Sequence, residues 1–134
     1  MHPLVPVGLI AIATLAAILL SFVLKGVAPP TDANSLALYA TALGGGAAVG
    51  LLYQNPMRRL GLYGTALCGV VAVLLAQVPF CLAFTGIVLA TEPSLSFFET
   101  FKNMLFQGWL ALGPLQAACG AVAGGIVWAL RKRA

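Results

Sequence analysis

The hydrophobic positions of this chain fall into four long stretches that contain no charged side chain. The stretches cover residues 3–24, 33–57, 60–91 and 103–130. All seven Lys or Arg, all three Asp or Glu and the one His lie between or outside them. The hydrocarbon core of a bilayer is about 30 Å thick, and an α-helix crosses it in about 20 residues. The pattern therefore predicts four membrane-spanning helices.

We expect an all-α membrane protein, an antiparallel bundle of four transmembrane helices forming one membrane domain over residues 1–134. The predicted spans are about 4–24, 36–54, 62–90 and 105–130. Asn55 and Pro56 are expected to stop the second span, and Pro79 is expected to kink the third. Residues 94–102 have an amphipathic pattern, which predicts a short interfacial helix between spans three and four.

The composition agrees with a chain that lies almost entirely in lipid. Hydrophobic residues make up 61% of it and charged residues 7%, against about 25% charged residues in soluble domains. The mean hydropathy is +1.03. The first stretch has no basic residue before it and no small-residue cleavage site after it, so we interpret it as an uncleaved helix. Any activity is then expected within the membrane or at its faces.

The positive charges indicate how the chain lies across the membrane. The net charge is +4, and the cations cluster at Arg58 and Arg59 and at Arg131, Lys132 and Arg133. Cationic connections face the cytoplasm, so we expect an inner-membrane protein with both termini cytoplasmic. Cations beside a membrane also attract anionic headgroups, which makes membrane lipids expected partners and nucleic acid an unexpected one.

Glycines at helical spacing are the clearest motif, because they let helix backbones approach closely in lipid. The expected helix-packing positions are Gly44, Gly45, Gly46, Gly50, Gly120 and Gly124. Packing within the chain is the first interpretation, and contact with another subunit or a second copy stays open. In any complex, we expect the face of Gly46 and Gly50 to be an interface. The run from Gly44 to Gly46 could alternatively unwind its helix locally, as transporter helices do.

Two glutamines are the notable polar residues inside the predicted spans. Gln77 lies two residues before Pro79, and Gln116 lies two residues after Pro114. Both fall at similar depth in the outer half of the membrane. We expect their amides to face inward and to bond each other or the carbonyl groups that the prolines leave free. Contact with a substrate is the alternative.

The remaining residues offer little for chemistry. Cys68, Cys81 and Cys119 form no CxxC or Cys/His pair, and His2 is the only histidine. No charged residue lies at bilayer depth, where proton-coupled carriers need one. We therefore expect no enzyme, no catalytic or metal-binding residue and no cofactor. The leading hypothesis is a non-enzymatic accessory or structural subunit of a larger inner-membrane complex. The alternative is a small homo-oligomeric channel, carrier or holin-like pore for a neutral or anionic solute.

Overall fold

The computed structural model describes residue 2 and residues 4–133. It contains four helices: α1 (Val5–Leu24), α2 (Ala33–Arg59), α3 (Leu62–Thr91) and α4 (Phe97–Arg133). Each helix is long and apolar enough to cross a membrane. The described chain is therefore all-helical, with the character of a multi-pass membrane protein.

The second helix is longer than the sequence predicts. It begins at Ala33 and continues through Asn55 and Pro56 to Arg59. Pro56 removes only one helical hydrogen bond, the one to the carbonyl four residues earlier, so a helix can pass through it near its end. The amide of Leu60 then donates to the carbonyl of Pro56 over 3.1 Å. Pro56 therefore lies in the last turn of α2, and the expected stop at Asn55 and Pro56 is wrong.

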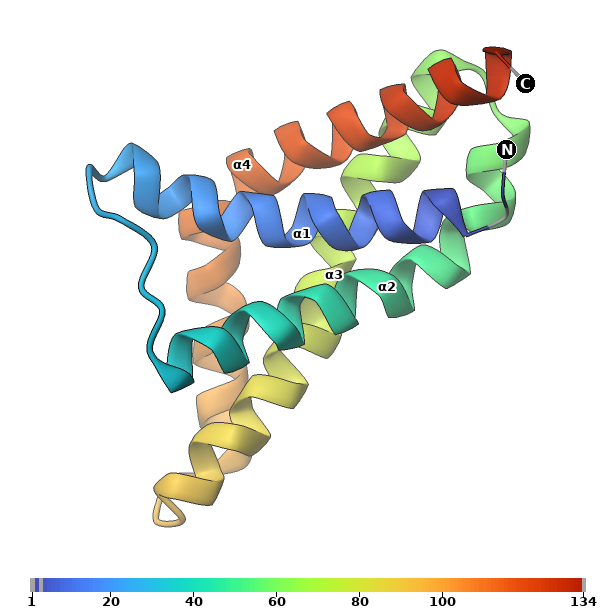
Figure 1. The fold of residues 1–134 in the computed structure, drawn as a ribbon. Coiled ribbons are helices and arrows are strands. Elements are labelled where there is room, and N and C mark those ends of the chain that lie inside the picture. Colours follow the sequence, from blue (N-terminus) through green and yellow to red (C-terminus); the bar gives the residue numbers. More distant parts are fainter. Residues whose placement is uncertain (1, 3, 134) are drawn as a thin grey trace.

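The fourth helix takes in the segment that was expected to form a separate short helix. No break divides residues 97–102 from the fourth span, and α4 runs for 37 residues. Figure 1 shows α4 changing direction midway along its length, and Pro114 lies inside this helix. A proline in a helix interior removes a hydrogen bond and bends the helix. The chain thus bends α4 at its middle instead of interrupting it near residue 103.

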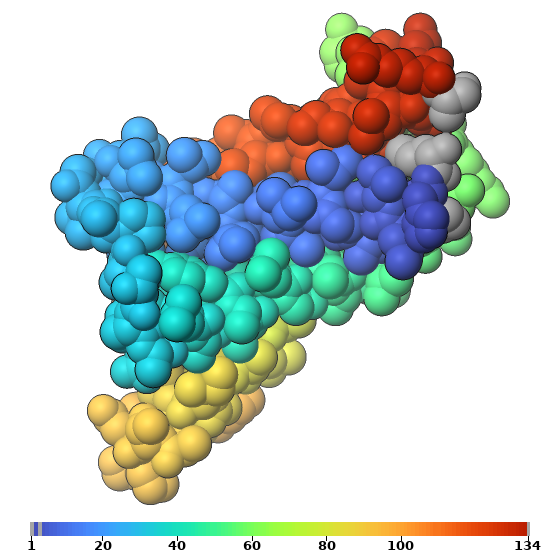
Figure 2. All heavy atoms as spheres, in the orientation of Figure 1, coloured from blue at the N-terminus to red at the C-terminus, as the bar shows by residue number. Residues whose placement is uncertain are grey.

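Helices that follow one another in the chain pack against one another, and α1 also packs against α4. Figure 1 shows both termini at the same end of the molecule. At the other end, the hairpin of α3 and α4 projects beyond α1 and α2, as Figures 1 and 2 show. The buried core has two parts. One is built around Ile10, Val49, Met57, Val73 and Val127, and the other around Ile18, Ala42, Phe80 and Cys81.

The contact between α3 and α4 is a direct contact of backbones. A Cβ added at Gly120 would lie 2.7 Å from the carbonyl carbon of Gly69 and 2.8 Å from the Cα of Val70. A Cβ added at Gly124 would lie 2.7 Å from the Cα of Ala66. Real Cβ atoms do not approach so closely, so only glycine fits at these positions. The predicted packing glycines of α4 therefore serve the α3–α4 contact.

The glycine pair of α2 meets α1 in the same way. A Cβ at Gly46 would lie 2.7 Å from both the Cα of Ala11 and the hydroxyl oxygen of Thr14, and one at Gly50 would lie 2.9 Å from the Cα of Val7. This is the face that we expected at an interface with a partner. In this chain α1 covers it, so a partner has to use another surface.

The three consecutive glycines of α2 divide between two environments. Gly45 packs on α3, where an added Cβ would lie 3.0 Å from the carbonyl oxygen of Ala76 and from the amide nitrogen of Phe80. Gly44 is exposed, and an added Cβ there would meet no described atom within 4 Å. Gly44 was expected to be a packing position, and within this chain it packs on nothing. The run stays helical throughout, without the local unwinding considered from the sequence.

We predict that Gly124→Ala destabilises the protein by about 1–3 kcal/mol, the usual effect of overpacking, because its Cβ has no space against α3. Gly125→Ala is the matched control, since a Cβ there meets no described atom within 4 Å. Thermal unfolding in detergent measures both variants. Equal melting temperatures for the two variants would contradict the backbone contact.

Candidate functional site

The two intramembrane glutamines meet between α3 and α4. The amide nitrogen Nε2 of Gln116 donates to Oε1 of Gln77 over 2.7 Å. Their side chains are 3% and 1% exposed for Gln77 and Gln116, respectively. The inward orientation expected from the sequence is present, and of the two expected kinds of bond the structure has the direct bond between the amides. Neither amide bonds a carbonyl freed by Pro79 or Pro114 in the described part of the chain.

The glutamine pair continues into a short polar chain with one unused acceptor. Nε2 of Gln77 donates to the Sγ of Cys81 over 3.4 Å. Oε1 of Gln116 is buried and has no hydrogen-bond partner among the described residues. A buried polar atom without a partner costs about 1–3 kcal/mol of stability. The pair therefore stabilises the α3–α4 contact while keeping one acceptor unsatisfied.

Two residues of α4 that carry no sign of this role in the sequence lie at the site. Gly108 of α4 lies against the Gln77 amide, and a Cβ added there would lie 3.1 Å from Cδ of Gln77. The indole of Trp109 donates from Nε1 to the carbonyl of Leu74 over 2.9 Å. This bond joins α4 to α3 beside the glutamine pair.

A crevice of about 350 Å³ lies beside the glutamine pair. All four helices contribute to it, and its polar lining comes from Ser21, Lys25, Gln77, Cys81 and Gln107. Its apolar wall includes Phe80, Phe84 and Leu112. Amide groups can both donate and accept hydrogen bonds, and the exposed Lys25 adds positive charge at the end of α1. The crevice could hold a small neutral or anionic molecule.

The cations used to predict topology gather at the end that carries both termini. Arg131 of α4 donates from Nη1 to the carbonyl of Met57 over 3.1 Å, and from Nη2 to the carbonyl of Leu60. It thus satisfies backbone oxygens where α2 passes into α3. The Nζ of Lys132 lies 4.8 Å from the centre of the Trp128 ring, within the range of a cation–π contact. The other three cations at this end are exposed: Arg58, Arg59 and Arg133.

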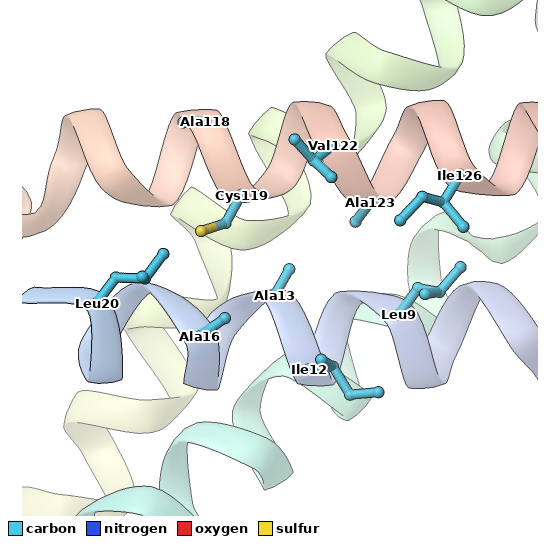
Figure 3. Close-up of a pocket in the computed structure, with 10 residues that line it drawn as sticks. All are labelled: Leu9, Ile12, Ala13, Ala16, Leu20, Ala118, Cys119, Val122, Ala123 and Ile126. Atoms are coloured by element: carbon cyan, nitrogen blue, oxygen red, sulfur yellow. The ribbon is translucent and has the colours of Figure 1, made fainter. Parts of the chain in front are cut away.

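A second hollow, a groove between α1 and α4, is purely hydrocarbon apart from one thiol. Figure 3 shows the two helices side by side, with several lining side chains between them: Leu9, Ala13, Leu20, Cys119, Ala123 and Ile126. Its volume is about 350 Å³. Half of its lining consists of small side chains, namely Ala13 and Ala16 on α1 and Ala118, Cys119 and Ala123 on α4. It has no polar group that could orient a hydrophilic ligand.

Within residue 2 and residues 4–133, no group of three or more His, Cys, Asp or Glu side chains could hold a metal ion. The cysteines Cys68, Cys81 and Cys119 are free thiols. Outside the spans, the Ser35 hydroxyl donates to Asp32 over 2.6 Å and holds the pKa of that carboxyl below its usual value.

Comparison with protein-family models, curated proteins and solved structures finds no match for this chain.

We predict that Gln77 and Gln116 are energetically coupled by about 0.6–2 kcal/mol, the range for hydrogen bonds between membrane helices. Gln77→Leu and Gln116→Leu each leave a buried amide without its partner, whereas the double variant removes both amides. The double variant should therefore lose less stability than the sum of the single variants. Unfolding free energies in detergent test this cycle, and strictly additive losses would contradict the bond.

Proposed function

We propose that this chain is a non-enzymatic accessory subunit of a larger inner-membrane complex, and that α2 is the helix that docks on its partner. The observation that carries the proposal is the exposed face of α2. Ala40, Gly44 and Ala48 recur every four residues and are all exposed. An added Cβ at Gly44 would meet no described atom within 4 Å.

The physics of helix association in lipid favours this face as a contact surface. Lipid tails are as apolar as leucine, so helices associate through close packing of small residues. A glycine inside a helix costs about 1 kcal/mol relative to alanine, as measured in water. Gly45, Gly46 and Gly50 offset that cost through contacts inside the chain. Gly44 has no such contact, and a partner helix on α2 would supply one.

The polar groups inside the spans support a structural role. The Thr14 hydroxyl donates to the carbonyl of Ile10 over 2.8 Å, and the Thr85 hydroxyl donates to Sδ of Met104 over 3.5 Å. Gln77 and Gln116 bond each other. These contacts fit side chains that stabilise helices, because an active site needs polar groups directed at a substrate.

The cationic end supports the orientation that we propose for the chain. With Arg58, Arg59 and the last three cations in the cytoplasm, the four spans form an antiparallel bundle with both termini inside. The connection between α3 and α4 then lies outside. The first turns of α4 then lie at the outer interface. There Nζ of Lys102 lies 3.5 Å from Oε2 of Glu99.

We expect reporter fusions to place the two ends of α4 on opposite sides of the membrane. A fusion after Ala134 should report the cytoplasm, and one inserted at Ser94 should report the outside. A fusion at Asn55, in the last turns of α2, is the internal control and should agree with the one at Ala134. Identical reports from Ala134 and Ser94 would contradict the orientation.

We also expect Gly44→Leu to separate the protein from its partner without unfolding it. The leucine has space within the chain but blocks close approach of another helix. Native gels and co-purification in mild detergent should show loss of the larger species, with an unchanged melting temperature. Gly86→Leu is the matched control, because Gly86 is an exposed helical glycine on α3 with no described atom within 4 Å of an added Cβ.

Two results would contradict this docking face. One is an unchanged complex in Gly44→Leu, and the other is an equal loss of the complex in Gly86→Leu. Gly46→Leu serves as a third variant. Its side chain would meet Ala11 and Thr14 within the chain, so its melting temperature should fall. If Gly44→Leu lowers the melting temperature as much as Gly46→Leu does, that result would also contradict the proposal that Gly44 faces only outward.

The second candidate function is a small homo-oligomeric channel, carrier or pore for a neutral or anionic solute. The crevice beside Gln77, with Lys25 and Gln107 in its lining, is the observation that favours it. Purified protein in liposomes should then conduct a solute. Gln77→Leu should abolish the flux, whereas its effect on stability should be no larger than the loss of its bond to Gln116. An accessory subunit should give no flux by itself.

A further inference from the structure

The groove between α1 and α4 is about as long as one membrane leaflet is thick, and it runs along the middle of α1. Its lining extends from Leu9 to Leu20 along α1. Eleven residues of helix rise about 16 Å, and half of a hydrocarbon core is about 15 Å. The side chains of Ile12 and Val122 are 61% and 63% exposed, so the groove is open to the surrounding bilayer. A hydrocarbon chain can therefore enter it from the side and lie along it.

The groove is narrow where short side chains line it. Ala13 and Ala16 of α1 face Ala123 of α4 across it (Figure 3). Its volume of about 350 Å³ lies along about 16 Å of helix, which gives room for a hydrocarbon chain.

One end of the groove points toward the cationic end of the protein. Leu9 and Ile126 lie at the same end of the groove in Figure 3, and both termini lie at the same end of the molecule in Figure 1. Arg133 lies seven residues after Ile126, which places it on the same face of α4 two turns further on. Arg131 is bonded to the carbonyls of Met57 and Leu60, whereas Arg133 is exposed.

We infer that this groove binds an anionic phospholipid, with one acyl chain between α1 and α4 and the phosphate at Arg133. A hydrocarbon chain fills the apolar slot, and a guanidinium binds phosphate oxygens through charge-assisted hydrogen bonds. Basic positions between membrane helices on the cytoplasmic side are suited to anionic headgroups. The lipid site uses α1 and α4, so it does not depend on the partner proposed for α2.

The test is native mass spectrometry of the purified protein with added phosphatidylglycerol or phosphatidylcholine. The wild type should retain one phosphatidylglycerol molecule and bind it about fivefold or more tightly than phosphatidylcholine, since one cation contributes about 1 kcal/mol. Ala118→Leu should reduce retention of both lipids by adding bulk at the rim of the groove. Arg133→Gln should remove the preference for phosphatidylglycerol and leave packing unchanged.

Each variant has a control of the same chemistry outside the groove. Ala83→Leu adds the same bulk at an exposed position of α3, and Lys25→Gln removes a charge at the far end of α1. Both controls should retain phosphatidylglycerol as the wild type does. Equal affinity of the wild type for the two lipids, unchanged retention in Ala118→Leu, or equal losses in the controls would each overturn the inference. Loss of a protein partner with retained lipid in Ala118→Leu would assign the groove to a helix instead.

Discussion

The structure depends on the place where the backbones of α3 and α4 touch. Gly120 lies against Gly69, and Gly124 lies against Thr65 and Ala66, without side chains between the helices. This contact brings the Gln77 and Gln116 amides within 2.7 Å of each other. Toward the end that carries the termini, it brings Arg131 to the carbonyls of Met57 and Leu60, at the end of α2 and just after it. In lipid, where apolar side chains gain little from contact with one another, close packing of this kind holds helices together.

Close packing of small residues also explains how α2 is held and which of its sides is left exposed. Gly45 contacts α3, and Gly46 and Gly50 contact α1, so α2 is held on two sides by backbone contacts. Its third side carries Ala40, Gly44 and Ala48, which are small and exposed. Helix α2 thus has glycine where it touches α1 and α3 and also carries Gly44 on its exposed side, which is consistent with a further helix at that position.

Much of the fold could be predicted from the sequence, because bilayer thickness and uncharged length together define the spans. The inward orientation of Gln77 and Gln116 could also be predicted, from depth along consecutive helices, whereas the sequence left open whether they bond each other or carbonyls freed by the prolines. The end of α2 could not be predicted, because Pro56 in the last turn removes one backbone hydrogen bond without stopping the helix. The sequence also could not predict which helix each glycine contacts, because a GxxxG pattern is the same whether α1 or another protein covers it. Gly108 carries no sequence signal, as its role exists only once Gln77 lies against it.

The central claim is that α2 turns Gly44 outward to a partner while its neighbouring glycines face the chain itself. Site-specific photocrosslinking in native membranes tests it most directly, with a benzophenone amino acid placed singly at Ala40, Gly44, Ala48, Ala83 and Gly86. The account predicts crosslinks to another polypeptide, or to a second copy, from the three α2 positions and none from the two α3 positions. Crosslinks to lipid alone from Ala40, Gly44 and Ala48 would contradict it.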